Sequence, residues 1–149
     1  TFGPDGVTHH ADHRAISRWT TEAWRREQPG ELFYAAMTLD YVAEHRELHD
    51  RLGVFADVPG GRPVSVGRSM IRLECTLDDT ELDRKRRALA AHASQTTGLA
   101  TMMGEETYRT WWRSERFRCP STAEIAQCEV SAAIQDQSLP GRELVGAAS

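Results

Sequence analysis

Residues 2–24 read FGPDGVTHHADHRAISRWTTEAW and join a turn, a histidine-rich segment and the first part of an amphipathic helix. The turn signal is the Pro-Asp-Gly run at 4–6. Apolar side chains then recur at helical spacing, which predicts a helix from about His10 to Glu27 that the Pro29-Gly30 pair ends. We expect its buried stripe to consist of Ala15, Ile16, Trp19, Ala23 and Trp24.

Beyond this helix, the chain alternates short apolar runs with helical patterns. LFYAAM at 32–37 predicts a buried strand, and the alternating SMIRLECTL at 69–77 predicts a second one. The remaining expected elements are helices at 41–52, 78–96, 99–103 and 105–112, and a last strand at 116–118. The pattern is mixed α/β. Two well-marked strands are too few for a compact α/β layer, so we expect part of the fold to be missing from these 149 residues.

Length and charge narrow the class of protein. The 149 residues suffice for one domain, and no run of about 18 apolar residues predicts a membrane span. The net charge of −4 argues against nucleic acid as the main partner. Cys75, Cys119 and Cys128 lack C-x-x-C spacing and no signal peptide is recognisable, which together indicate reduced thiols in a cytoplasmic protein.

The strongest chemical signal lies at the predicted start of the first helix. His10 and His13 are three residues apart, which places both side chains on one helix face, and Asp12 lies between them. A catalytic zinc ion takes about three protein ligands and lowers the pKa of a bound water towards ~7. A histidine that is not bound to metal can donate a proton to a leaving amine, because its ordinary pKa is near ~6.5. The alternative is that these side chains only cap a polar helix end.

Two segments resemble the PIG-L (LmbE-like) family of zinc-dependent N-deacetylases. Residues 2–24 resemble its second signature, a Gly-rich loop followed by G-H-P-D-H and an amphipathic helix. KRRALAAHASQT at 85–96 resembles a later segment in which a lysine-bearing helix ends in H-x-S-Q. The resemblance spans about residues 2–117. It implies a Rossmann-like α/β fold that hydrolyses N-acetyl groups, mostly on amino sugars.

The resemblance also implies roles for individual side chains. His13 would be a ligand of zinc or another divalent metal, and Asp12 would orient His10. His10 would be the general acid or the electrostatic partner of the tetrahedral oxyanion. The implied substrate pocket would be lined by His9, His92 and Gln95. Two positions depart from the family pattern, because His9 stands where the family has Gly and Ala11 where it has Pro. A glycine tolerates unusual backbone angles, so we expect His9 to shift the loop.

The family's first signature, A-H-P-D-D-E, does not occur in the sequence. In the family it supplies the other zinc ligands and the general base. We therefore expect residues 1–119 to be the C-terminal half of a PIG-L-like domain and residues 120–149 to be a tail, with the fragment inactive alone. The alternatives left open are a non-catalytic remnant that keeps the fold without the complete zinc site, and a phosphoesterase. The sequence does not decide the substrate or whether the protein is a homo-oligomer.

Other candidate residues have simpler interpretations. His45 and His49 are four apart, yet the HRELH pattern is not H-E-x-x-H, and we expect a solvated helix face there. Trp111 and Trp112 could stack on a sugar, but aromatic residues at this spacing are more often core. The basic run at 84–87 follows several acidic residues, which favours a solvated helix laced with ion pairs.

Overall fold

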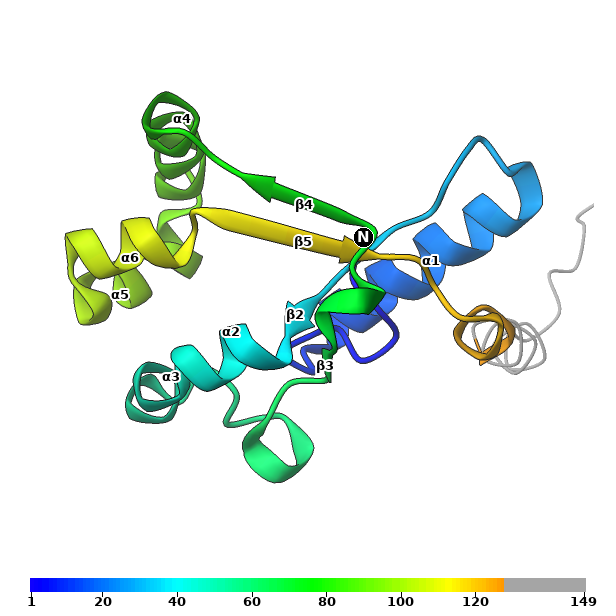
Figure 1. Cartoon of the computed structure of the whole chain (residues 1–149), viewed down its shortest axis with the longest axis horizontal. Coiled ribbons are helices and arrows are strands. Elements are labelled where there is room, and N and C mark those ends of the chain that lie inside the picture. Colours follow the sequence, from blue (N-terminus) through cyan, green and yellow to red (C-terminus); the bar gives the residue numbers. More distant parts are fainter. Residues whose placement is uncertain (128–149) are drawn as a thin grey trace, which may run out of the picture.

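The computed structural model describes residues 1–127, which form a mixed α/β chain with two small sheets (Figure 1). Cys128 and most of the expected tail at 120–149 lie outside the described residues. No helix in the described part of the chain is both long enough and apolar enough to cross a membrane.

The first helix, α1 (Ala11–Glu27), forms where the sequence predicts it. Its expected buried stripe is wrong, because Ile16 and Trp19 are 46% and 60% exposed, whereas Ser17 and Thr21 are fully buried. The Thr21 hydroxyl forms a 2.7 Å hydrogen bond with the hydroxyl of the equally buried Tyr34. The small hydroxyl face of α1 is therefore the one turned to the rest of the chain.

The larger sheet is antiparallel, with strands in the order β1-β5-β4. These strands are β1 (Tyr34–Ala35), β4 (Leu73–Thr76) and β5 (Ser114–Arg118). Glu74 lies opposite Arg116, whose Nε donates to the Glu74 carboxylate at 2.7 Å, a pairing of opposite charges that stabilises neighbouring strands. The Ala36 N–H extends the β1 edge by donating to the Arg116 carbonyl at 2.8 Å.

The smaller sheet pairs β2 (Met37–Thr38) with β3 (Ser65–Val66) in parallel. The connection between them contains α2 (Leu39–Glu44), α3 (Arg46–Leu52) and the 3₁₀ turn η1 (Pro59–Gly61). A second 3₁₀ turn, η2 (Arg68–Met70), leads into β4. The single strand predicted at 32–37 is therefore wrong, since the run divides at Ala36 between two sheets. The helix predicted at 41–52 likewise divides, at His45.

Three helices follow β4: α4 (Asp79–Ala90), α5 (Ala93–Met103) and α6 (Glu105–Trp111). Asp78 and Glu81 form a reciprocal capping box that satisfies backbone N–H groups at the start of α4. The helix predicted to run to about Thr96 stops at Ala90, and a new one begins after His92. α5 packs against α3, α4 and α6.

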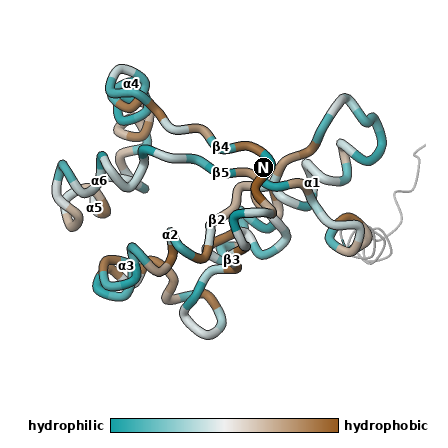
Figure 2. Tube along the Cα trace, viewed as in Figure 1, coloured by the Kyte–Doolittle hydropathy of each residue, from teal (hydrophilic) through white to brown (hydrophobic). Residues whose placement is uncertain are grey.

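The main hydrophobic cluster lies among these helices and consists of Met103, Tyr108 and Trp111 with half-buried neighbours. β4 and β5 run from this helical group towards α1 (Figure 1). β4 is largely exposed, whereas β5 is half-buried to buried. Leu73 on β4 is 43% exposed. Figure 2 shows hydrophobic segments in several separate parts of the chain. Other exposed large apolar side chains are Leu39, Val64, Met70 and Met102.

Candidate metal and small-molecule site

The loop that precedes α1 has an unusual backbone. Gly6, Val7 and His9 all have positive φ angles, of 70°, 61° and 62°. The loop is held by the Gly6 N–H, which donates to the Gly3 carbonyl at 2.9 Å, and by the Asp5 carboxylate, which accepts from the Val7 N–H at 3.1 Å. His9 thus adopts the left-handed conformation that glycine takes easily, at a cost of roughly 1–2 kcal/mol for a side chain with Cβ.

His13 lies one turn into α1 and its ring is fixed from two sides. Nδ1 is 3.1 Å from the Gly6 carbonyl oxygen and 3.1 Å from the Thr8 hydroxyl. Phe2 stacks on the ring with centroids 4.1 Å apart and planes 13° apart. Because a carbonyl oxygen only accepts, the contact with Gly6 is a hydrogen bond in the tautomer that carries its proton on Nδ1, and in that tautomer Nδ1 donates. Nε2 then keeps its lone pair, the arrangement that metal-binding histidines usually show.

His10 and Asp12 lie beside His13. One potential ligand atom from each of the three residues falls within 4.8 Å of the others. Ligands of one tetrahedral zinc ion lie about 3.4 Å apart, so the three side chains form a cluster of potential ligands rather than a completed site. The His10 and His13 rings have centroids 5.2 Å apart. Three nitrogen and oxygen donors of this kind suit zinc.

The contacts of Asp12 and His10 differ from those that the resemblance implies. Asp12 Oδ1 accepts a hydrogen bond from the backbone N–H of His13 at 2.9 Å. The exposed His10 ring has Nε2 3.8 Å from Oδ2 of the exposed Asp57. In this arrangement Asp12 stabilises the first turn of α1, and the carboxylate facing His10 Nε2 comes from the loop after α3.

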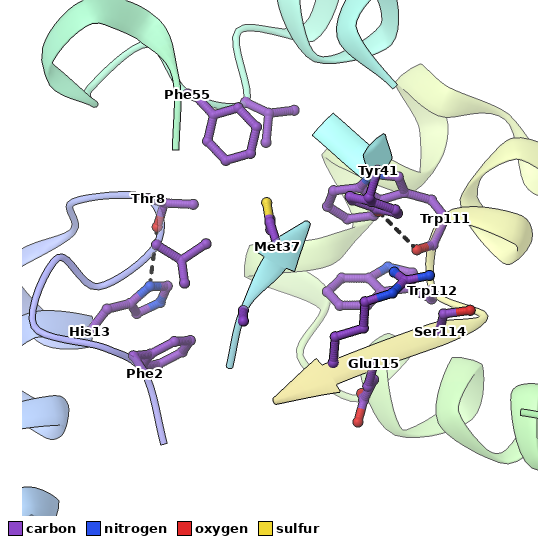
Figure 3. A pocket seen from close by; sticks show the side chains of 14 residues that line it. Phe2, Thr8, His13, Met37, Tyr41, Phe55, Trp111, Trp112, Ser114 and Glu115 are labelled. Atoms are coloured by element: carbon purple, nitrogen blue, oxygen red, sulfur yellow. Dashed lines mark hydrogen bonds between the residues drawn. The ribbon is translucent and has the colours of Figure 1, made fainter. Parts of the chain in front are cut away.

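A cavity of about 390 Å³ opens next to His13 (Figure 3). His13, Thr8 and Phe2 form one side of it, and Tyr41, Trp111 and Trp112 line the opposite side. Met37 and Phe55 lie between the two sides in Figure 3. The cavity therefore brings together three stretches that are distant in the sequence, and it links the histidine cluster to the aromatic residues at the end of α6.

The charged groups in the cavity wall are paired with other charges. Glu115 pairs with Lys85, which also donates to the Trp112 carbonyl at 3.0 Å. Arg116, opposite Glu74 on β4, also lies over the Tyr41 ring, with its guanidinium carbon 5.4 Å from the centroid. The Tyr41 hydroxyl donates to the Trp111 carbonyl at 3.3 Å, and burial raises the pKa of Tyr41 above its usual range.

His49 lies behind this wall and is only 2% exposed, so the predicted solvated helix face is wrong at this residue. Trp111 Nε1 donates to His49 Nε2 at 3.0 Å. Burial, and next the neighbouring His45, lower the pKa of His49 to about 4. Nδ1 of His49 has no hydrogen-bond partner within residues 1–127. His45 is half-buried, with Nδ1 3.1 Å from the Tyr41 carbonyl.

The other residues implied at the substrate pocket lie elsewhere. His9 lines a separate, more open hollow of about 320 Å³ together with Arg14 and Glu124. His92 and Gln95 are exposed at the junction of α4 and α5 and do not line the cavity beside His13. The structure thus brings His10, Asp12 and His13 together and places His9, His92 and Gln95 apart from them.

Sequence reasoning missed much of the cavity wall. Trp111 and Trp112 were recognisable as aromatic candidates, whereas Met37, Tyr41 and Phe55 carry no motif that would mark them. A scan against protein-family models gave no match, and searches of curated proteins and of solved structures gave none either. The class of protein therefore has to be argued from the motifs and from the geometry of this site.

Proposed function

We propose that the protein is a metal-dependent amide hydrolase that removes an N-acetyl group from an amino sugar or a related small-molecule conjugate. The observation that supports this best is the His13 ring, whose Nδ1 lies 3.1 Å from the Gly6 carbonyl oxygen, a contact that favours the tautomer with a lone pair on Nε2. The motif resemblance agrees with this role, since it makes His13 a zinc ligand. The Rossmann-like PIG-L fold is part of the same proposal.

The residues around His13 would have different roles in hydrolysis. A bound divalent ion would supply polarisation of the amide carbonyl and a more acidic water. His10, with its ring 5.2 Å from that of His13, would hand a proton to the leaving amine. Asp12 would fix the start of α1 by accepting a hydrogen bond from the His13 backbone N–H.

Metal binding is the direct test of this proposal. Zinc content would be measured at pH 7.5 on a longer protein that joins this chain to the family's remaining zinc ligands, with the variants His13→Gln and His92→Gln side by side. His92 is the matched control because it is an exposed histidine outside the cluster. We expect up to one zinc per chain in the unsubstituted protein and in His92→Gln, and loss of zinc in His13→Gln. Equal zinc in all three, or none in the unsubstituted protein, would refute metal binding through His13.

Turnover separates the role of His10 from that of His13. We expect His10→Ala to keep zinc and to slow the release of acetate from an N-acetylated amino sugar by about 10²–10⁴-fold. The carboxylate nearest to His10 in the structure belongs to Asp57, whose Oδ2 lies 3.8 Å from His10 Nε2. Unchanged turnover in His10→Ala would remove the general-acid role and leave the metal ligand in place.

A non-catalytic binding module is the second candidate. One specific observation favours it: the cavity is lined by side chains from three stretches of the chain, whereas His10 and Asp12 are exposed. Ligand binding without any acetate release in the presence of zinc would support the binding module over the hydrolase.

A further inference from the structure

We infer that the cavity between His13 and Trp112 binds a neutral small molecule that carries an aromatic ring. This inference does not rest on the proposed hydrolysis, because it concerns the aromatic wall and needs no metal. The volume of about 390 Å³ falls in the range of roughly 300–1,000 Å³ that is typical of small-molecule sites. Such sites usually combine an apolar lining with a few polar groups.

The shape of the wall favours a flat ring. Trp111 and Trp112 meet edge to face, with ring centroids 4.8 Å apart and planes 73° apart. Phe2 and Phe55 contribute further rings to the lining. Aromatic rings prefer offset-stacked or edge-to-face neighbours, and each such pair contributes about 0.5–1.5 kcal/mol beyond the buried area. Two perpendicular indoles offer both kinds of contact to a third ring.

Clusters of aromatic rings also bind organic cations, but two of these rings already have cations of the protein over them. Lys85 Nζ lies 4.8 Å from the Trp112 ring centroid, and the Arg116 guanidinium lies 5.4 Å from that of Tyr41. Both basic side chains are well covered, with 16% and 13% exposure. These two rings are therefore less available to a ligand cation, because each already has a cation of the protein over it.

An anion is disfavoured for the complementary reason. Lys85 is paired with Glu115 and Arg116 with Glu74, so each of these two positive charges already has a carboxylate partner. An anion would lose its hydration without gaining an ion pair, which is costly. At the opposite side, Nε2 of His13 can accept a hydrogen bond, which suits a neutral ligand with an N–H or O–H donor.

Two fluorescent probes with nearly the same aromatic frame test the inference. N-phenyl-1-naphthylamine is neutral, and 8-anilinonaphthalene-1-sulfonate carries a negative charge. Binding would be followed by probe emission in the presence of a metal chelator. We expect saturable binding of the neutral probe, at least about tenfold tighter than that of the sulfonate. Equal binding of both probes, or no saturation, would overturn the inference.

Matched tryptophan variants locate the bound probe. Trp112→Ala should weaken binding by about tenfold, whereas Trp19→Ala should leave it unchanged, because Trp19 is 60% exposed on α1. Val54→Phe adds bulk to the cavity lining. It provides a second variant if the circular dichroism spectrum shows that Trp112→Ala does not fold. It should weaken binding as well. Equal effects of Trp19→Ala and Trp112→Ala, or unchanged binding in Val54→Phe, would refute this location.

Discussion

Acidification should destabilise the protein through His49. This imidazole is 2% exposed and accepts a hydrogen bond from the Trp111 indole, and its pKa falls from the ordinary 6.5 to about 4. The neutral form is therefore the one that the folded chain favours. Between pH 6.5 and about 4, the unfolded chain binds a proton that the folded chain does not. The free energy of unfolding must fall as the pH decreases across this window.

The size of this effect follows from the two pKa values. Each unit of difference corresponds to 1.36 kcal/mol, so the gap between 6.5 and about 4 amounts to about 3 kcal/mol. Above pH 6.5 His49 should contribute no slope, and below pH 4 its contribution should level off. This loss is a sizeable part of the roughly 5–15 kcal/mol that stabilise a typical domain.

Urea unfolding at pH 7.5, 6.0, 5.0 and 4.5 would measure this slope. The variant His49→Gln does not titrate and keeps an oxygen that can accept from the Trp111 indole, so its stability should depend on pH less steeply by about 3 kcal/mol over the window. His45→Gln, on the preceding turn and only half-buried, is the matched control and should keep most of the slope. Parallel pH profiles for the native chain and His49→Gln would refute the reasoning.

Two further predictions concern the loop and the hydroxyl pair. His9→Gly should raise the free energy of unfolding by about 0.5–1 kcal/mol, measured by urea unfolding. Glycine adopts the positive φ of this position without strain, although it costs some backbone entropy. His9→Ala keeps a Cβ atom and should give no gain. An equal gain in both variants would show that the backbone angle is not the cause. Tyr34→Phe should cost about 1–3 kcal/mol by leaving the buried Thr21 hydroxyl without this partner. Adding Thr21→Val should recover part of the loss, and a double variant less stable than Tyr34→Phe would contradict this.

The sequence predicted the extent of α1 but not its orientation. Helical spacing, the Pro29-Gly30 pair and the turn before His10 mark its ends, and these are local signals. Which face is buried depends on a partner distant in the chain. The buried Thr21 hydroxyl forms a hydrogen bond with that of Tyr34. A prediction from the spacing of apolar side chains places Thr21 on the surface, because it takes no account of such polar contacts.

The division of the run at 32–37 has a similar cause. Its apolar residues predicted one buried strand, yet β1 pairs with β5 while β2 pairs with β3. Strand partners are chosen by contacts across the fold, so the break at Ala36 has no local signal. The start of α4 was more predictable, because Asp78 and Glu81 form a cap from neighbouring residues alone.

The candidate site shows the same limit. The spacing of His10 and His13 predicted that both lie on one helix face, and the structure brings one potential ligand atom from each of them and from Asp12 within 4.8 Å of the others. The cavity beside them was not predictable, because its wall joins residues 2–13, 36–55 and 111–116. The burial of His49 follows from its contact with Trp111, which lies 62 positions away.

Because the cavity wall comes from three separate stretches of the chain, ligand binding in the cavity should stabilise the folded state. A compound held there touches stretches that come together only in the folded chain, so it should bind the native state in preference to the unfolded one. By mass action, a ligand at a hundredfold excess over its Kd would add about 2.7 kcal/mol to the free energy of unfolding. The melting temperature thereby becomes a function of ligand concentration, and a thermal-shift screen of neutral aromatic compounds would reveal the occupant before any reaction is known.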